Sequence, residues 1–155
     1  MIAPADGTVV EIGEGFAPGE LEMGDQPLSR VTLVSGAFDS HSVRIPADGV
    51  IERVEFRGGR LGSALAPAAL LDHERLGLRL RLENGSVLGL VQVSGRGLPK
   101  LSWSVVENQP VQAGYVYGVS RLGGRVDLYL PVGSTLHVRP GQKMVAGETM
   151  LARIP

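Results

Sequence analysis

The stretch Tyr117–Pro131, YGVSRLGGRVDLYLP, joins a glycine pair to a run in which apolar and polar residues alternate. The apolar members are Val126, Leu128 and Leu130, and the residues between them are Arg125, Asp127 and Tyr129. Alternation with a period of two predicts a half-buried strand. The preceding Gly123 and Gly124 predict a bend, or a place where the backbone comes very close to another part of the molecule.

The whole chain carries similar β signals, with 22 glycines and 10 prolines among 155 residues. In Leu76–Val93, leucines alternate with arginines before Asn84-Gly85, which is a favoured hairpin turn. Only Ala64–Arg75 has a helical pattern, with Pro67 suited to a first turn. We therefore expect a mostly β protein of one domain, residues 1–155, with at most one or two short helices.

Two pairs of related segments indicate an internal duplication. APADGTVVEI at 3–12 corresponds to IPADGVIERV at 45–54, at a spacing of 42 residues, and PVQAGYVY at 110–117 corresponds to KMVAGETM at 143–150, at a spacing of 33. Each segment combines a turn with a strand. The repeats predict a pseudo-symmetric β-sandwich or barrel, similar to the hammerhead barrels of biotinyl and lipoyl domains.

Composition excludes several classes of function. The 15 basic and 16 acidic residues give a net charge of -1, which argues against a nucleic-acid partner. The absence of cysteine excludes disulfides and thiolate metal sites, and we expect no metal. No apolar run approaches the roughly 18 residues of a membrane span. We expect a cytoplasmic protein, with peripheral contact at the inner membrane as an open possibility.

The Tyr117–Pro131 run resembles the self-cleavage region of phosphatidylserine decarboxylases of the short branch, where the pattern is close to GxxRFGSRVDxYLP. The tail GQKMVAGETMLA, residues 141–152, is similar to the family pattern GxxVxAGETxLA. The resemblance extends from Pro4 to Ala152 and makes residues 1–155 a phosphatidylserine decarboxylase-like domain. It implies a carboxy-lyase that forms phosphatidylethanolamine, a phosphatidylserine-like phospholipid as ligand, contact with a membrane surface, and a homo-oligomer.

The main departure from the family pattern is at residue 124. Family members cleave themselves between Gly and Ser, and the Ser becomes a pyruvoyl group; this chain has Gly123-Gly124 at the cleavage junction. That chemistry needs a side-chain oxygen after the scissile bond, first to attack the preceding carbonyl and then to leave by β-elimination. Gly124 has no such oxygen, so we expect neither cleavage nor a cofactor in this chain.

Asp6, in Pro4-Ala5-Asp6-Gly7, matches a family SPADG motif whose acid helps to activate the base for self-cleavage. As an Asp before Gly it is also an ordinary turn residue, and this explanation suffices for Asp48 in the matching repeat. Both interpretations of Asp6 remain open.

His41 lies in FDSHSVRIP, residues 38–46, which is similar to the family's FDVHVNRAP. The resemblance makes His41 a candidate general acid or base at the active site, a role that suits its ordinary pKa near 6.5. The alternative is a structural histidine in a turn at a strand end. His73 and His137 match no motif, and we expect both at the surface.

Ser134 offers a second possible nucleophile, because Val132-Gly133-Ser134-Thr135 is similar to the LGST cleavage motif of the longer family branch. That motif precedes its strand, whereas Ser134 follows the strand here. Moving the cleavage point along the strand displaces it by roughly 30 Å. The simpler interpretation is a turn.

Three functions therefore stay under consideration. The first is a non-catalytic homologue that binds phospholipid, or a precursor trapped by an engineered change at residue 124. The second is an active pyruvoyl-dependent decarboxylase that is cleaved before Ser134. The third is a β-sandwich interaction module. Departures from the family pattern at 59–75 and 92–102, which the resemblance places on the substrate and membrane side, favour natural divergence.

Overall fold

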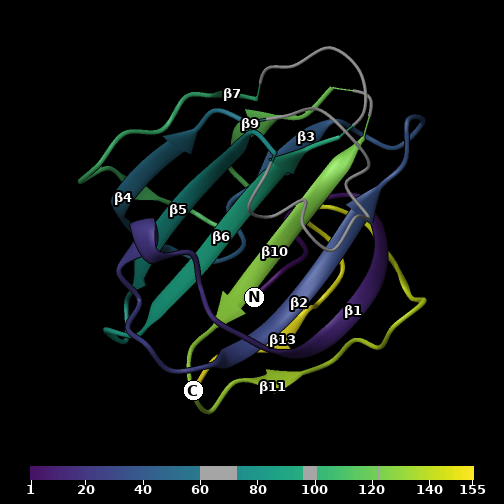
Figure 1. Ribbon diagram of the computed structural model, residues 1–155. Helices are drawn as coiled ribbons and strands as arrows, with labels where there is room; N and C mark the ends of the chain where they lie inside the picture. Colours follow the sequence, from purple (N-terminus) through teal and green to yellow (C-terminus); the bar gives the residue numbers. More distant parts are fainter. Residues whose placement is uncertain (60–72, 96–100, 122) are drawn as a thin grey trace.

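The computed structural model describes residues 1–59, 73–95, 101–121 and 123–155. Their regular structure is almost entirely β, as predicted (Figure 1). The strands are β1 (Gly7–Gly15), β2 (Leu28–Ser35), β3 (Ser42–Arg44), β4 (Gly49–Arg57), β5 (Arg75–Leu82), β6 (Val87–Ser94), β7 (Ser102–Trp103), β8 (Pro110–Val111), β9 (Val116–Val119), β10 (Gly124–Leu130), β11 (Thr135–Leu136), β12 (Lys143–Met144) and β13 (Ala152–Arg153). Within the described ranges, the single helical element is the 3-10 turn η1 (Gly19–Leu21).

The long strands form one curled antiparallel sheet, in the order β12-β1-β2-β10-β6-β5-β4-β8 (Figure 1). Two smaller sheets, β3-β9-β7 and β11-β13, complete the fold. Alternate residues of the long strands point into a shared apolar core that includes Leu33, Ile51, Leu78, Leu90 and Leu128. The short β3-β9-β7 sheet contributes Val43 and Tyr117 to the same core.

The sheet order is symmetric about its centre, and this confirms the predicted duplication. Gly7 pairs with Met144, and at offsets of 42 and 33 residues Gly49 pairs with Val111 in the same way. The β1–β2 register shifts between Val9 and Glu11, and the β4–β5 register shifts at the equivalent place, between Ile51 and Arg53. The approximate two-fold axis passes between β6 and β10.

The hairpin predicted around Asn84-Gly85 is confirmed, because β5 and β6 pair along their length and Gly85 has a φ of +83°. Residues 64–72 of the predicted helix lie outside the described part of the chain, and Arg75 is the first residue of β5. His137 is exposed as predicted, but the prediction for His73 is wrong, since it is only 7% exposed. The chain is already tied to β6 at this point, where the Glu74 carbonyl accepts the N–H of Ser94.

The prediction that β10 is half-buried is also wrong, because all seven of its residues are buried. On the face of β10 that carries them, the buried side chains of Arg125 and Asp127 are paired with one another. The Arg125 guanidinium donates to both oxygens of Asp127, at 2.7 and 2.9 Å, and the Thr32 hydroxyl donates to Asp127 at 2.6 Å. Beside this cluster Tyr129 packs with Leu21, so the strand is buried on both sides.

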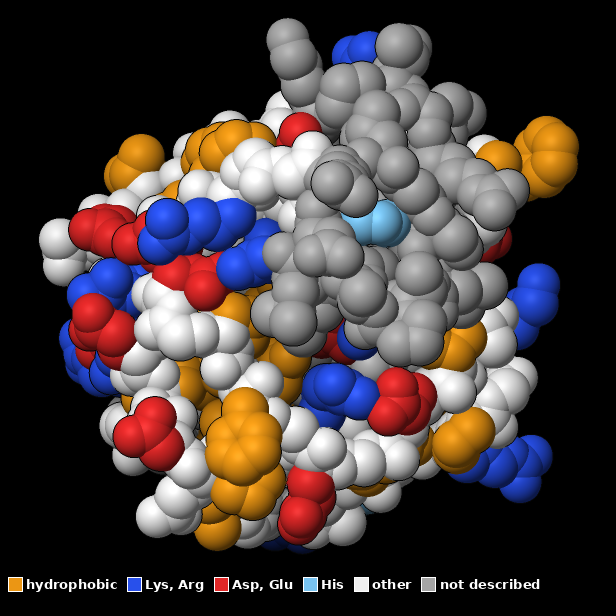
Figure 2. Space-filling model, in the orientation of Figure 1, with side chains coloured by type: hydrophobic (Ala, Val, Ile, Leu, Met, Phe, Trp, Pro, Cys, Tyr) orange, Lys and Arg blue, Asp and Glu red, His pale blue; other side chains and the backbone are white. Residues whose placement is uncertain are grey.

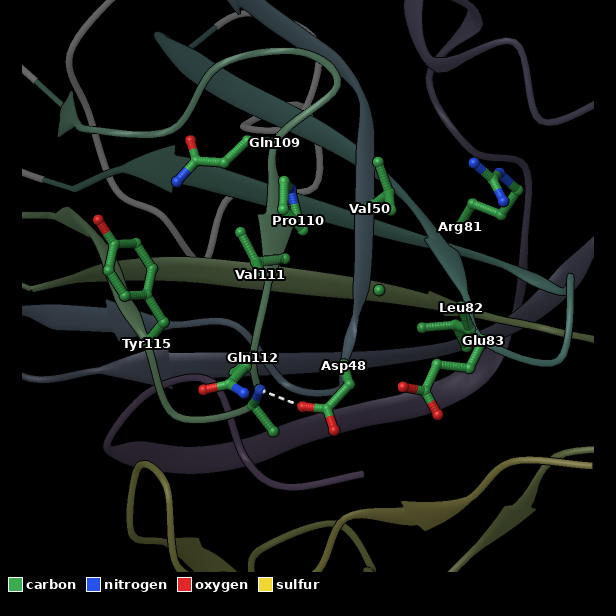
Figure 3. Close-up of a pocket in the computed structure, with 12 residues that line it drawn as sticks. Asp48, Val50, Arg81, Leu82, Glu83, Gln109, Pro110, Val111, Gln112 and Tyr115 are labelled. Atoms are coloured by element: carbon green, nitrogen blue, oxygen red, sulfur yellow. Dashed lines mark hydrogen bonds between the residues drawn. The ribbon is translucent and has the colours of Figure 1, made fainter.

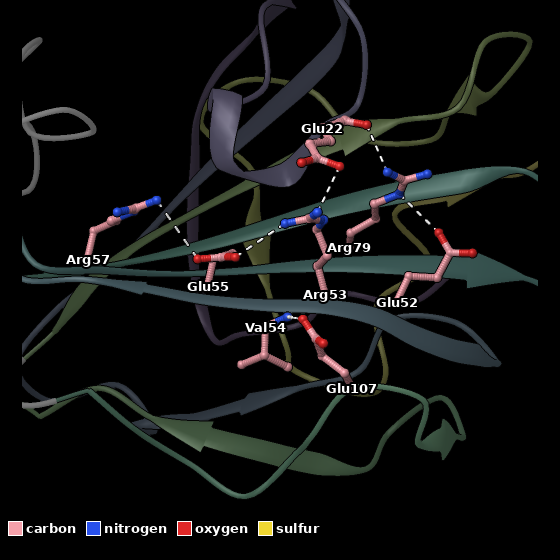
Figure 4. A network of polar contacts seen from close by, with 8 residues as sticks. All are labelled: Glu22, Glu52, Arg53, Val54, Glu55, Arg57, Arg79 and Glu107. Atoms are coloured by element: carbon pink, nitrogen blue, oxygen red, sulfur yellow. Dashed lines mark hydrogen bonds and ion pairs between the residues drawn. The ribbon is translucent and has the colours of Figure 1, made fainter.

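The outer face of β4 and β5 carries exposed ion pairs instead (Figure 4). Arg53 contacts Glu22 at 2.8 Å and Glu55 at 3.3 Å, and Arg79 contacts Glu52 at 3.0 Å. Figure 2 shows acidic and basic side chains interspersed on this side of the molecule. Exposed pairs contribute about 0–1 kcal/mol each, so this face is a solvated surface rather than a site.

Candidate cleavage junction and its surroundings

The Gly123-Gly124 junction lies where β10 begins, in the middle of the main sheet. Gly124 pairs with Ser35 on β2 and with Ser94 on β6. Gly123 has a φ of +83°, which favours glycine, and a Cβ at that position would stand 2.6 Å from the carbonyl oxygen of Ser35. The close backbone approach predicted for the glycine pair is therefore present.

The space for a side chain at residue 124 is already filled. A Cβ on Gly124 would stand 2.6 Å from the Ser120 Oγ and 2.9 Å from the Val93 carbonyl oxygen. The Ser120 hydroxyl is buried and donates a hydrogen bond to the carbonyl oxygen of Gly123, at 3.0 Å. A hydroxyl group is thus present at the junction, but it belongs to Ser120.

His41 lies next to this hydroxyl-bearing residue. Its Nδ1 is 3.1 Å from the Ser120 carbonyl oxygen, and the Ser120 N–H donates to the His41 carbonyl at 2.9 Å. Because a carbonyl only accepts, Nδ1 carries the proton in this contact, and Nε2 is the ring nitrogen that could accept a proton. His41, Ser120 and Gly124 line one small cavity together with Ser35. The structure therefore brings His41 and the junction together.

Asp6 approaches the junction through its backbone and not through its carboxylate. Its carbonyl oxygen accepts a hydrogen bond from the Ser35 hydroxyl, and Ser35 is the partner of Gly124 in the sheet. Its carboxylate accepts the N–H of Ala146 at 2.7 Å. Among the described residues, no hydrogen bond or ion pair joins this carboxylate to His41.

Ser134 lies at the other end of β10, in the turn that leads to β11 (Figure 1). Its N–H and its Oγ both donate to the Pro131 carbonyl, at 3.2 and 2.7 Å. Gly133 has a φ of +88°. The Ser134 hydroxyl therefore closes a serine turn on Pro131, and it is not bonded to the carbonyl of Gly133.

A hollow of about 750 Å³ lies elsewhere in the molecule (Figure 3). It is lined in part by Asp48, Arg81, Glu83, Gln112 and Tyr115. None of its lining residues belongs to the cavity beside His41. In the part of the chain that the structure describes, no group of histidine and acidic residues is arranged to hold a metal ion, and no helix is long and apolar enough to span a membrane.

Sequence reasoning missed Ser120 and the buried cluster of Arg125, Asp127 and Thr32. The signal for Ser120 was its position three residues before Gly123, a spacing at which a hydroxyl can bond a turn carbonyl. The signal for the cluster was an acid two residues after an arginine on one strand, since such residues share a face. Parts of the two divergent segments, 60–72 and 96–100, lie outside the described residues.

Comparison with known proteins identifies the class of protein. The family model for phosphatidylserine decarboxylase matches residues 1–152. Three phosphatidylserine decarboxylase proenzymes illustrate the similarity. The Mycobacterium marinum protein is 42% identical over 155 residues, which are 100% of this chain and 65% of that protein. The Mycobacterium tuberculosis protein (strain ATCC 25177 / H37Ra) is 40% identical over 152 residues, with coverages of 98% and 66%.

The Saccharopolyspora erythraea protein is 38% identical over 153 residues, with coverages of 99% and 65%. The chain thus spans about two thirds of the length of these relatives. No solved structure matches it. The match to the family model covers nearly every residue, so the chain belongs to the phosphatidylserine decarboxylase family.

Proposed function

We propose that this chain is a non-catalytic member of the family, which remains uncleaved at Gly123-Gly124 and binds phospholipid. The observation that supports this is the absence of any side chain at residue 124, together with the filling of its place by Ser120 and Val93. The prosthetic group of the family provides an electrophilic carbonyl for the substrate amine. The residues at this junction do not fit it, because Gly124 has no side-chain hydroxyl to attack the Gly123 carbonyl and then leave by β-elimination, the steps by which a serine is converted to that group.

The other side chains at the junction form a stable and unreactive arrangement. The Gly123 carbonyl is hydrogen-bonded by Ser120, and Gly124 is paired on both sides within the sheet. A neutral His41 has an Nε2 that can accept a proton, but position 124 offers no hydroxyl to donate one. Proton transfer therefore has no nucleophile to activate at position 124.

The mass of the purified chain tests the first part of this proposal. We expect one species of 16.4 kDa under denaturing conditions, with no reaction toward hydroxylamine. Two fragments produced by cleavage between Gly123 and Gly124, or a reactive carbonyl, would overturn the proposal. Fragments separated before Ser134 would instead favour the alternative, a chain cleaved at that serine.

Phospholipid binding is supported by an exposed aromatic side chain near His41. Phe38 has no burial at all, with a relative exposure of 104%, and precedes His41 by three residues. The Asp39 carboxylate accepts the N–H of Gly36 at 2.7 Å and so closes the loop that carries Phe38. An aromatic side chain held at a loop tip is suited to insertion at a membrane interface.

Sedimentation with vesicles of phosphatidylserine and phosphatidylcholine tests this second part. We expect the unmodified chain to sediment with the vesicles and Phe38→Ser to remain largely in solution. Phe16→Ser is the matched control, because Phe16 is also exposed, at 64%. Phe16 follows the last residue of β1, whereas the loop of Phe38 follows β2 beside the first residues of β1. Equal binding by the two variants, or no binding by the unmodified chain, would contradict a role for this loop.

A further inference from the structure

The Ser120 hydroxyl, where it now lies, and a side chain introduced at residue 124 would compete for the same space. The Ser120 Oγ is 2.6 Å from the place where a Cβ on residue 124 would stand, which is closer than real non-bonded contacts of a Cβ. The Ser120 Cβ is 3.5 Å from the same point, which is an ordinary van der Waals distance. Of the atoms of Ser120, only the hydroxyl oxygen therefore competes for this space, which the Val93 carbonyl oxygen also borders at 2.9 Å.

The same hydroxyl is the hydrogen-bond donor of a buried contact with the Gly123 carbonyl. Gly123 O receives the Ser120 hydroxyl at 3.0 Å in a buried setting. Gly95 lies close to the same oxygen, since a Cβ on Gly95 would stand 2.9 Å from it. A buried carbonyl without a hydrogen-bond partner is unfavourable. The Ser120 hydroxyl can serve as that partner because no side chain at 124 occupies its place.

We propose that Ser120 is a positioning residue that occupies the place of the side chain absent at 124 and holds the Gly123 carbonyl, so that the two positions are coupled. The inference rests on the proposed function, since it explains how the junction is stable without its nucleophile. Its consequence is that a serine introduced at 124 must first displace the Ser120 hydroxyl from the Gly123 carbonyl. Restoring the nucleophile alone therefore restores self-cleavage poorly.

The first experiment is a double-mutant cycle on unfolding, with Ser120→Ala, Gly124→Ala and both together. Alanine cannot cleave the chain, so this cycle is independent of whether the unmodified protein is active. We expect Gly124→Ala to lower the denaturation midpoint much less when Ser120→Ala is also present. Additive effects of the two changes would overturn the coupling, since neighbours in contact are expected to deviate from additivity.

Ser94→Ala is the matched control in this cycle. Ser94 is 5% exposed and pairs with Gly124 from β6, and its hydroxyl has no hydrogen-bond partner among the described residues. It does not provide any of the three atoms nearest to the position of a Cβ on Gly124. We expect its effect to add to that of Gly124→Ala. Coupling as strong as that of Ser120 would show a general effect of small side chains, and would also overturn the proposal.

The second experiment measures self-cleavage by intact mass over time, which a purely structural role for Ser120 would leave unchanged. We expect Ser120→Ala with Gly124→Ser to cleave at least about threefold faster than Gly124→Ser alone. Ser94→Ala with Gly124→Ser is expected to match Gly124→Ser. Equal rates in the two variants that differ at Ser120, including no cleavage in either, would contradict the proposal. A cleaved unmodified chain would refute the proposed function and leave the unfolding cycle to decide on the coupling.

Discussion

The Asp6 carboxylate accepts a hydrogen bond from the backbone N–H of Ala146, at 2.7 Å, across 140 residues of sequence. Its counterpart in the other half of the molecule makes the same contact, because Asp48 accepts the N–H of Ala113 at 2.7 Å. The contact joins the two kinds of turn found in the repeats. Since both halves have it and only one contains the cleavage junction, it stabilises the duplicated fold whatever else Asp6 does.

The two contacts should therefore have similar energies. Asp6→Asn and Asp48→Asn keep an acceptor oxygen and lose the charge that strengthens the bond, so each is expected to lower the free energy of unfolding by about 1 kcal/mol. Urea denaturation of the two variants measures this, with the exposed Asp25→Asn as a control that should have no effect. A loss at only one of the two sites would show that the halves are not energetically equivalent.

The buried pair of Arg125 and Asp127 should be much more sensitive. Arg125→Met leaves the Asp127 carboxylate, which is 0% exposed, with the Thr32 hydroxyl as its one remaining side-chain donor among the described residues. We expect a loss of about 3–5 kcal/mol in unfolding free energy. Arg53→Met, which removes exposed ion pairs, is the control and should cost about 1 kcal/mol or less. Comparable midpoint shifts for the two variants would contradict the assignment of β10 as buried on both faces.

The glycine at the junction and its counterpart in the β5–β6 turn should respond differently to alanine. Gly123 and Gly85 have the same φ of +83°, but a Cβ on Gly123 meets the Ser35 carbonyl oxygen at 2.6 Å, whereas a Cβ on Gly85 has nothing within 4 Å. Gly85→Ala is expected to cost about 1–2 kcal/mol from the backbone conformation alone. Gly123→Ala should cost clearly more in the same denaturation experiment, and an equal cost would mean that the backbone there can move aside.

Stability should fall at alkaline pH because of Tyr129. Burial raises the pKa of Tyr129 to about 12, and the nearby Asp127 carboxylate adds to the effect. In the unfolded chain the phenol titrates near its ordinary value of about 10, so its contribution is complete below pH 10 and is lost as the pH rises from about 10 to about 12. Burial also raises the pKa of Tyr117.

Unfolding free energies at about pH 9 and about pH 11 measure this dependence. Tyr129→Phe removes the phenol and keeps the ring, so it should reduce the drop in stability between the two pH values. If the variant and the unmodified chain lose stability equally over this interval, Tyr129 is not a source of the alkaline dependence.

The class of fold was predictable because it depends on local patterns. The period-two alternation and the Asn84-Gly85 turn identified strands and a hairpin, and the spaced repeats identified the duplication. Alternation failed at β10 because Arg125 is buried against the oxygens of Asp127, and the Asp127 carboxylate in turn accepts the hydroxyl of Thr32, which lies on another strand. Sequence spacing gives no information on such a partner.

The candidate site was predictable only in part, for a similar reason. The motif around His41 indicated a residue beside the junction, and the structure places it there through Ser120. The direction of the Asp6 carboxylate depends on the distant Ala146 turn, and the role of Ser120 depends on how closely two backbones approach. Neither property can be derived from residue types alone.

The position of β10 also determines what a cut at its first residue could reveal. This strand is hydrogen-bonded along its length to β2 on one edge and to β6 on the other, so a nicked polypeptide would stay together as a single folded particle. Gel filtration would give the same elution for severed and unsevered molecules. A cleavage of the backbone at the start of β10 would therefore not separate the two fragments, and only denaturing conditions would reveal it.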